Sequence, residues 1–177
     1  MNRLQSFGKA ELKAVRRARA EAEALVGDFY VLAPREWERM TYEVRTLEEL
    51  APEEIHNQAF AQVLCYDFTR RIGQTILDRR DLYRICLQDH RILQAITGSR
   101  PVAPKADKLA LEPFLLYLLT HELIHIVRFT QRMQHLDLAP ALRPQEEMNV
   151  EQTTRHILAR VADRALRHVL EACAASC

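Results

Sequence analysis

The chain has 177 residues, 48% of them hydrophobic, which is the length of one ordinary domain with enough apolar content to form a core. Its 25 basic and 24 acidic residues give a net charge of +1, so the composition provides no overall attraction to nucleic acid or an anionic membrane. The N-terminal segment lacks the apolar core of a signal peptide, and no apolar run reaches the roughly 20 residues of a membrane span. We therefore expect one cytoplasmic domain over residues 1–177, with no nucleic-acid or membrane partner.

The first part of the chain predicts a helix followed by two strands. Apolar residues recur at a spacing of three to four from Asn2 to Val26, and Gly27 is expected to end this helix. The segments 28–34 and 41–47 are rich in β-branched and aromatic residues and predict strands, with a turn over 34–39 between them.

The next part predicts a helix and then a third strand. Thr46 and Glu49 have the spacing of a capping box, and Pro52 suits a first helical turn. We therefore expect a helix from Pro52 to about residue 68. Over 82–88, strict alternation places Tyr83, Ile85 and Leu87 on one side, which favours a strand.

The C-terminal part predicts two long helices. The segment 97–108 contains glycine and prolines and predicts a loop, in which Asp107 is a candidate N-cap. The following helix, over 109–134, is apolar almost all round and belongs in the middle of a fold. A connection over 136–144 then leads to a last helix from Pro144 to about Ala172. These elements define an α+β fold that is mostly helical.

Three polar residues interrupt the apolar helix: His121, Glu122 and His125. The two histidines are four residues apart, so their imidazoles project from one helix face and can converge on one ion. Glu122 lies beside them, where a carboxylate can act as a general base. Polar residues can line up in this way by chance, but the flanking residues carry no charge before Arg128, which is unusual for a surface helix. The pattern predicts a metal site, and neutral imidazoles suit Zn²⁺.

The segment LLTHELIHIV, residues 118–127, resembles the extended HExxH signature of the zincin metallopeptidases at every position. The resemblance is confined to about ten residues. The metzincin branch would continue with glycine at 128 and histidine or aspartate at 131, and the chain has Arg128 and Gln131, which excludes it. The gluzincin branch takes its third zinc ligand from a glutamate on a following helix, often with a second carboxylate four residues later.

The resemblance implies that Glu147 and Glu151 fill these two roles. Both extend a core-facing line of the last helix that continues through Thr154, Leu158, Val161 and Ala165. We assign Glu147 as the third ligand and Glu151 as the partner that orients a zinc histidine. The reverse assignment stays open, and glutamates near Pro144 also favour a helix N-terminus electrostatically.

The resemblance further implies a small gluzincin. In its fold, an N-terminal helix and a small twisted sheet pack on the central active-site helix, and the C-terminal helix carries the glutamate ligand. Its activity would be hydrolysis of peptide bonds in a peptide or protein by a metal-activated water, with Glu122 as general base. Arg155 and His156 are candidates for stabilising the transition state. By analogy, the substrate would lie along an edge strand, for which 41–47 and 82–88 are the candidates.

Two other classes of protein fit parts of this pattern. A di-iron carboxylate protein in a four-helix bundle uses two ExxH motifs, which Glu53 with His56 and Glu122 with His125 would supply, but it leaves His121 unexplained. A non-catalytic protein would hold a structural metal in a closed site of four protein ligands, often cysteines.

Overall fold

The structure, a computed structural model, describes residues 4–72, 75–98, 109–131, 140–161 and 163–174. Its helices and strands confirm the predicted α+β class, mostly helical with a small sheet. In chain order they are α1 Lys9–Tyr30, α2 Pro34–Arg39, β1 Tyr42–Arg45, β2 Ala61–Ile72, β3 Thr75–Leu87, α3 Asp89–Thr97, α4 Leu111–Thr130, α5 Arg143–Leu158 and α6 Arg164–Ala174. Short 3₁₀ helices lie at Leu47–Glu49, Pro52–Glu54 and Pro140–Leu142.

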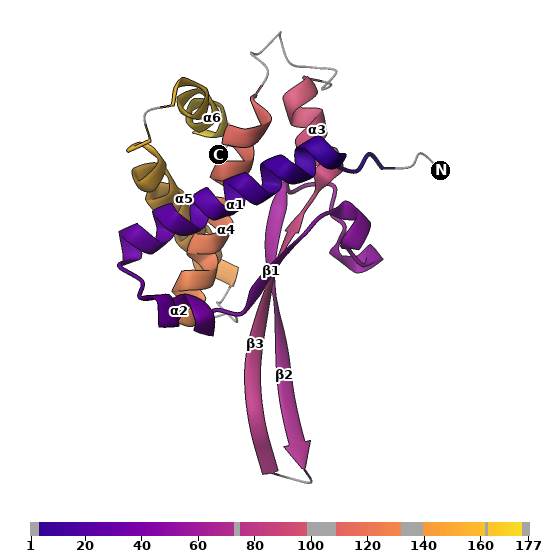
Figure 1. The fold of residues 1–177 in the computed structure, drawn as a ribbon, viewed down its shortest axis with the longest axis vertical. Helices are drawn as coiled ribbons and strands as arrows, with labels where there is room; N and C mark the ends of the chain where they lie inside the picture. Colours follow the sequence, from indigo (N-terminus) through magenta and orange to yellow (C-terminus); the bar gives the residue numbers. More distant parts are fainter. Residues whose placement is uncertain (1–3, 73–74, 99–108, 132–139, 162, 175–177) are drawn as a thin grey trace.

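The sheet has the strand order β1-β3-β2. β1 runs parallel to β3, and β2 pairs antiparallel with β3 along its whole length, with Val63 opposite Ile85. Figure 1 shows this hairpin extending well beyond the helices. Near its base, Val63 and Ile85 pack into the core, because alternate residues of both strands face the helices.

Helix α4 is the centre of the fold, as its sequence predicts. It packs against α1, α5, α6, β2 and β3. Twelve of its side chains are buried, from Phe114 to Val127. Helix α1 crosses α4 in Figure 1 and buries a stripe of small residues, which allows the two helices to approach closely. This stripe consists of Ala14, Val15, Ala18, Ala22 and Val26.

The predicted N-terminal helix exists, but its predicted end was wrong. Gly27 lies inside α1, and a Cβ at this position would come within 2.9 Å of the Trp37 indole nitrogen. The glycine therefore makes room for an aromatic ring and does not end the helix. Val31, in the left-handed conformation at φ 53°, follows the last residue of α1. The strand predicted over 28–34 is consequently absent.

The segment 34–39, predicted as a turn, forms helix α2. Pro34 occupies a first-turn position, and the Glu36 carboxylate accepts a hydrogen bond from the Ala33 backbone N–H at 2.7 Å. These local contacts stabilise a short helix where the sequence also resembles a turn. The strands predicted over 41–47 and 82–88 are confirmed as β1 and the end of β3.

The helix predicted from Pro52 to residue 68 was wrong. One 3₁₀ turn forms, and the chain then enters β2. The backbone groups that an α-helix would satisfy internally have partners elsewhere, because the buried Gln88 side chain donates to the Glu54 carbonyl at 2.8 Å and accepts from the His56 N–H at 3.0 Å. Beyond this point, pairing with β3 supplies the remaining hydrogen bonds.

The other predicted boundaries are partly confirmed. The helix predicted over 109–134 is α4, which ends at Thr130. Residues 99–108 of the predicted loop, including Asp107, and residues 136–139 of the predicted connection lie outside the described residues, and residues 140–144 form a 3₁₀ helix and the start of α5. Helix α3 was not predicted.

The single helix predicted from Pro144 to Ala172 is divided into α5 and α6. Asp163 is the reason for the break, because its carboxylate accepts hydrogen bonds from Ala165 N–H at 2.6 Å and Leu166 N–H at 3.0 Å and so begins a new helix.

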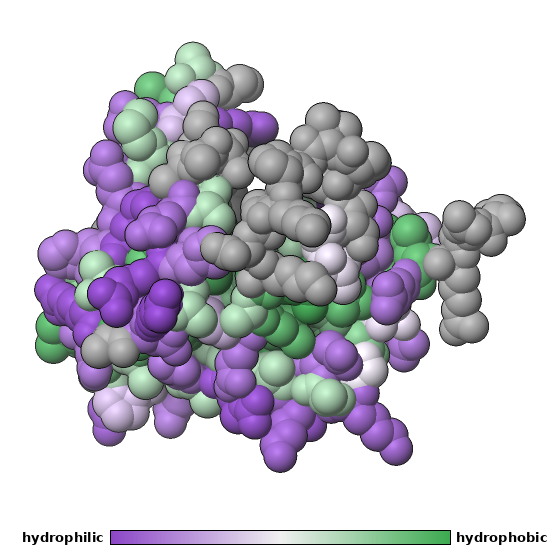
Figure 2. Space-filling view, turned by 90° about the horizontal axis from the view of Figure 1, so that it is seen from above, coloured by the Kyte–Doolittle hydropathy of each residue, from purple (hydrophilic) through white to green (hydrophobic). Residues whose placement is uncertain are grey.

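Seen from the end that carries α3, hydrophilic and hydrophobic residues are intermixed on the described surface, with one hydrophobic patch right of the centre of the view (Figure 2). Among the described residues, none of the helices combines the length and apolar character needed to cross a membrane.

Candidate metal centre

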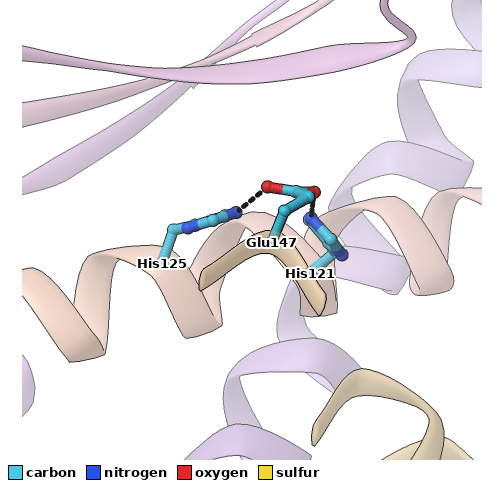
Figure 3. A group of neighbouring side chains, drawn as sticks. All are labelled: His121, His125 and Glu147. Carbon is cyan, nitrogen blue, oxygen red and sulfur yellow. Dashed lines mark hydrogen bonds and ion pairs between the residues drawn. The ribbon is translucent and has the colours of Figure 1, made fainter. Parts of the chain in front are cut away.

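The two histidines of the HExxH motif lie on one face of α4, as their spacing predicts. Both imidazoles are mostly buried, with side-chain exposures of 12% for His121 and 13% for His125. Their ring centroids are 5.0 Å apart. In Figure 3, the Nε2 atoms of both rings point toward the same carboxylate, that of Glu147.

Glu147 comes from the beginning of α5 and completes the cluster. One carboxylate oxygen lies 2.8 Å from His121 Nε2, and the other lies 3.3 Å from His125 Nε2. The candidate ligand atoms of the three residues lie within 4.8 Å of one another, and together they could hold a metal ion. The structure thus brings together the three residues that the sequence predicted as ligands.

The spacing of these atoms fits a small ion. Bonds of about 2.1 Å in a tetrahedral zinc site place neighbouring ligand atoms about 3.4 Å apart. The 2.8 Å and 3.3 Å contacts of Glu147 are close to this value, so small side-chain movements would admit an ion between the rings and the carboxylate. Two nitrogens and one oxygen are a donor set that zinc accepts in catalytic sites.

The charges of the cluster are strongly coupled. Burial alone would lower the pKa of His121, but its contacts with Glu147 and Glu151 outweigh burial and raise that pKa to about 10. Hydrogen bonds from His121 and His125 hold the pKa of Glu147 far below its usual range, against the effect of burial. Two carboxylates therefore face His121, an arrangement that favours a positive charge at this position.

Glu151 supports His121 and lies farther from His125. One of its oxygens is 3.6 Å from His121 Nδ1, slightly beyond hydrogen-bonding distance, and this Nδ1 is buried without a hydrogen-bond partner. The same oxygen accepts a hydrogen bond from the Tyr117 hydroxyl at 2.7 Å, and the other accepts one from Arg155 Nε at 2.6 Å. The geometry favours Glu147 at the metal and Glu151 behind His121.

The pKa of Glu151 reflects the same environment. Burial acts to raise this pKa, but the hydrogen bonds from Tyr117 and Arg155 and the nearby His121 ring lower it to about 2. Glu151 is therefore a carboxylate at every physiological pH and is available to accept the Nδ1–H of His121.

Glu122 is buried next to the histidines, with 7% of its surface exposed. Burial raises its pKa, while the charges of His121 and His125 act in the opposite direction. It lies seven residues before Phe129, whose ring stacks on Tyr83 of β3, so Glu122 shares the face of α4 that is turned to the sheet. The carboxylate is thus enclosed between the metal cluster and the sheet.

The two candidates for stabilising a transition state, Arg155 and His156, make contacts outside the metal cluster. Arg155 binds Glu151 and also donates to the Leu170 carbonyl of α6 at 2.7 Å, so it connects two helices. The candidate His156 does not join the cluster: it is exposed, packs its ring near Phe29 and lies 2.9 Å from Arg160. Adjacent residues of a helix point about 100° apart, which explains the difference.

Two aromatic residues of the site were not predicted. The Tyr117 ring lies 6.3 Å from that of His121, and the Phe129 ring stacks on His125 at 6.0 Å. They are four residues before the first histidine and four after the second, so helical spacing alone could have identified both.

The second ExxH motif does not join the cluster. Glu53 lies in a 3₁₀ turn, His56 follows it, and both side chains are exposed. The helix that a di-iron bundle would need at this position is replaced by the approach to β2.

Comparisons of the chain with family models, curated proteins and solved structures give no match.

Proposed function

We propose that this chain is a zinc-dependent metallopeptidase of the gluzincin type, with a zincin-like fold over residues 1–177. The observation that carries the proposal is the convergence of His121, His125 and Glu147, whose candidate ligand atoms lie within 4.8 Å of one another. Two of these residues come from α4 and one from α5, in the order that the HExxH resemblance implies.

The donor set supports zinc as the ion. Magnesium and calcium prefer sites made largely of oxygen ligands, and structural zinc sites are usually closed by four protein ligands. Among the described residues, the cluster supplies three candidate protein ligands. When bound there, zinc would supply Lewis-acid chemistry, polarising a peptide carbonyl and acidifying water.

Glu122 is the residue suited to proton transfer. It is adjacent to His121 in sequence, and burial raises its pKa above the usual value of a glutamate, which favours its acting as a proton acceptor and donor. In the proposed reaction, Glu122 takes a proton from the attacking water and returns it to the leaving amine as the peptide C–N bond breaks. The carboxylate ends in its starting state, and no covalent intermediate is needed.

The sheet offers one edge near α4 for an extended peptide. The candidate 82–88 lies in β3, whose residues 83–86 are paired with both β1 and β2, so this segment is not an edge strand. The candidate 41–47 is β1, whose four residues form the other edge. β2 is also an edge strand in the described sheet and packs against α4, so a peptide added along β2 is the arrangement we favour.

The decisive experiment compares the wild type with Glu122→Gln and with Glu112→Gln. Glu112 is a matched control because it lies on the same helix, is well exposed and pairs with Arg17. Each protein is loaded with zinc, its metal content is measured, and hydrolysis of casein and of a peptide library is followed. We expect one zinc per chain in all three proteins and a loss of roughly 10²- to 10⁴-fold in hydrolysis for Glu122→Gln alone.

Three results would contradict the proposal. Undiminished hydrolysis by Glu122→Gln would exclude the assigned mechanism. Two bound irons with an oxo-bridged absorption would favour the di-iron class. A wild type that binds zinc, hydrolyses no substrate and unfolds on chelation would favour a structural metal.

A further inference from the structure

Within the described part of the chain, the stretch 141–149 around Glu147 buries a single side chain, that of its neighbour Glu146. Between residues 141 and 149, Glu146 is the only buried residue, and Glu147 itself has a 59% exposed side chain. The large apolar residues of this stretch, Leu142 and Met148, are exposed by 55% and 49%. Hydrophobic packing therefore does not fix the position of Glu147, since the next buried apolar residue of α5 is Val150.

Glu146 is held by Arg128, near the end of α4. Its carboxylate accepts two hydrogen bonds from the guanidinium, one from Nε and one from the terminal nitrogen at 2.9 Å. The side chains are only 17% and 11% exposed, so this is a bidentate pair largely removed from water. Tyr30, the last residue of α1, lies close enough to Arg128 for each to shift the pKa of the other, so the ion pair lies where three helices meet.

The register of the two helices places this pair beside the metal cluster. Three pairs of side chains connect α4 to α5, and they occur in opposite order along the two helices. The pairs are Tyr117 with Glu151, His121 with Glu147, and Arg128 with Glu146. Arg128 lies three residues after His125, and Glu146 directly precedes Glu147. On both helices the ion pair is thus within one turn of a candidate ligand.

We propose that Arg128 and Glu146 are positioning residues that hold Glu147 against the two histidines and thereby set the metal affinity. This inference rests on the metal centre of the proposed function, but not on peptide hydrolysis. A ligand on an exposed first turn must be held in place for an ion to bind tightly, because ordering it on binding costs free energy. The Arg128–Glu146 pair provides that order before the ion arrives.

The test measures zinc affinity in Arg128→Gln, Glu146→Gln and Arg17→Gln. Arg17 is the matched control, because it makes a bidentate pair with Glu112 between α1 and the start of α4, away from the cluster. Affinity is determined by competition with a chromophoric chelator, and Co²⁺ absorption reports the coordination geometry. We expect the first two variants to bind zinc about 10- to 100-fold more weakly. Arg17→Gln should stay within about threefold of the wild type, because an exposed pair contributes little.

A merely structural role would lower the melting temperature without changing the zinc affinity or the Co²⁺ spectrum of the folded protein. The double variant Arg128→Glu/Glu146→Arg restores the pair with reversed charges and should recover part of the lost affinity. If the glutamine variants do not fold, Arg128→Lys tests the same role of the ion pair. This variant keeps the positive charge but loses the bidentate geometry, so it should bind zinc several-fold more weakly than the wild type.

Folded variants with wild-type zinc affinity would overturn the inference. A wild type that binds zinc at this cluster but hydrolyses no peptide would refute the proposed function and leave the inference intact. A wild type that binds no metal would refute the metal centre itself, before any variant is compared.

Discussion

The assignment of the third ligand gives the sharpest quantitative prediction. Glu147 contacts Nε2 of both histidines, at 2.8 Å and 3.3 Å, whereas Glu151 approaches only His121 Nδ1, at 3.6 Å. A structural zinc site with four ligands binds with roughly 10–16 kcal/mol, so one ligand accounts for about 2.5–4 kcal/mol. Glu147→Gln should therefore weaken zinc binding about 100- to 1,000-fold. Glu151→Gln removes a group that supports His121 and should weaken zinc binding about 10- to 100-fold.

The assay is a competitive zinc titration of the wild type and both variants at constant pH. Circular dichroism and the melting curve of each metal-free protein show that it is folded. The Co²⁺ spectrum adds a qualitative criterion, because loss of a direct ligand changes the coordination sphere and loss of a supporting group leaves the donor set intact. A larger loss for Glu151→Gln than for Glu147→Gln would show that the two roles are reversed and that this reading of the geometry is wrong.

Two further predictions concern protonation and the buried acid at the start of α3. Because the pKa of His121 is raised to about 10 and a metal-bound imidazole is neutral, zinc binding near pH 8 should release about one proton from this ring, and affinity should keep rising up to about pH 10. Titration calorimetry in buffers of different ionisation enthalpy checks this, and the absence of proton release would contradict it. Asp89 accepts hydrogen bonds from Phe7 N–H at 2.8 Å and Leu47 N–H at 3.1 Å, each on a different oxygen. Asp89→Asn leaves one buried N–H donor facing the NH₂ group of the asparagine. Urea unfolding should therefore show a free energy of unfolding lower by about 1–3 kcal/mol, and an unchanged midpoint would refute this role of Asp89.

The part of the site that sequence predicts best is the part made by one helix. His121 and His125 share a face because of helical geometry alone, and the apolar flanks of α4 already indicate burial. Glu147 is separated from them by a connection and could be proposed only from the resemblance to gluzincins. The structure places it at the cluster, yet the Arg128–Glu146 pair next to it was not predicted, because ion pairing between distant segments leaves no periodic signal.

The errors in secondary structure have a related cause. Residues 52–68 have acceptable helix signals, but the Gln88 side chain satisfies backbone groups at Glu54 and His56, and β3 pairs with the residues beyond. Long-range hydrogen-bond partners determine the secondary structure of such a segment, even where its local sequence favours a helix. Gly27 illustrates the same limit, since a glycine that ends a helix and one that makes room for Trp37 look alike in sequence.

The position of the cluster between two helices also explains its charge. In the structure, His121 lies between the carboxylates of Glu147 and Glu151, and its raised pKa means that it carries a proton at neutral pH. A metal ion would bring positive charge to the same side of the ring and displace that proton. The proton and the metal ion therefore compete for the same site. Exchange of one for the other requires no change in the arrangement of α4 and α5. The cross-helix contacts of Tyr117 and Arg128 hold the two helices in this register in either case, so the binding free energy can be used mainly for the metal–ligand bonds.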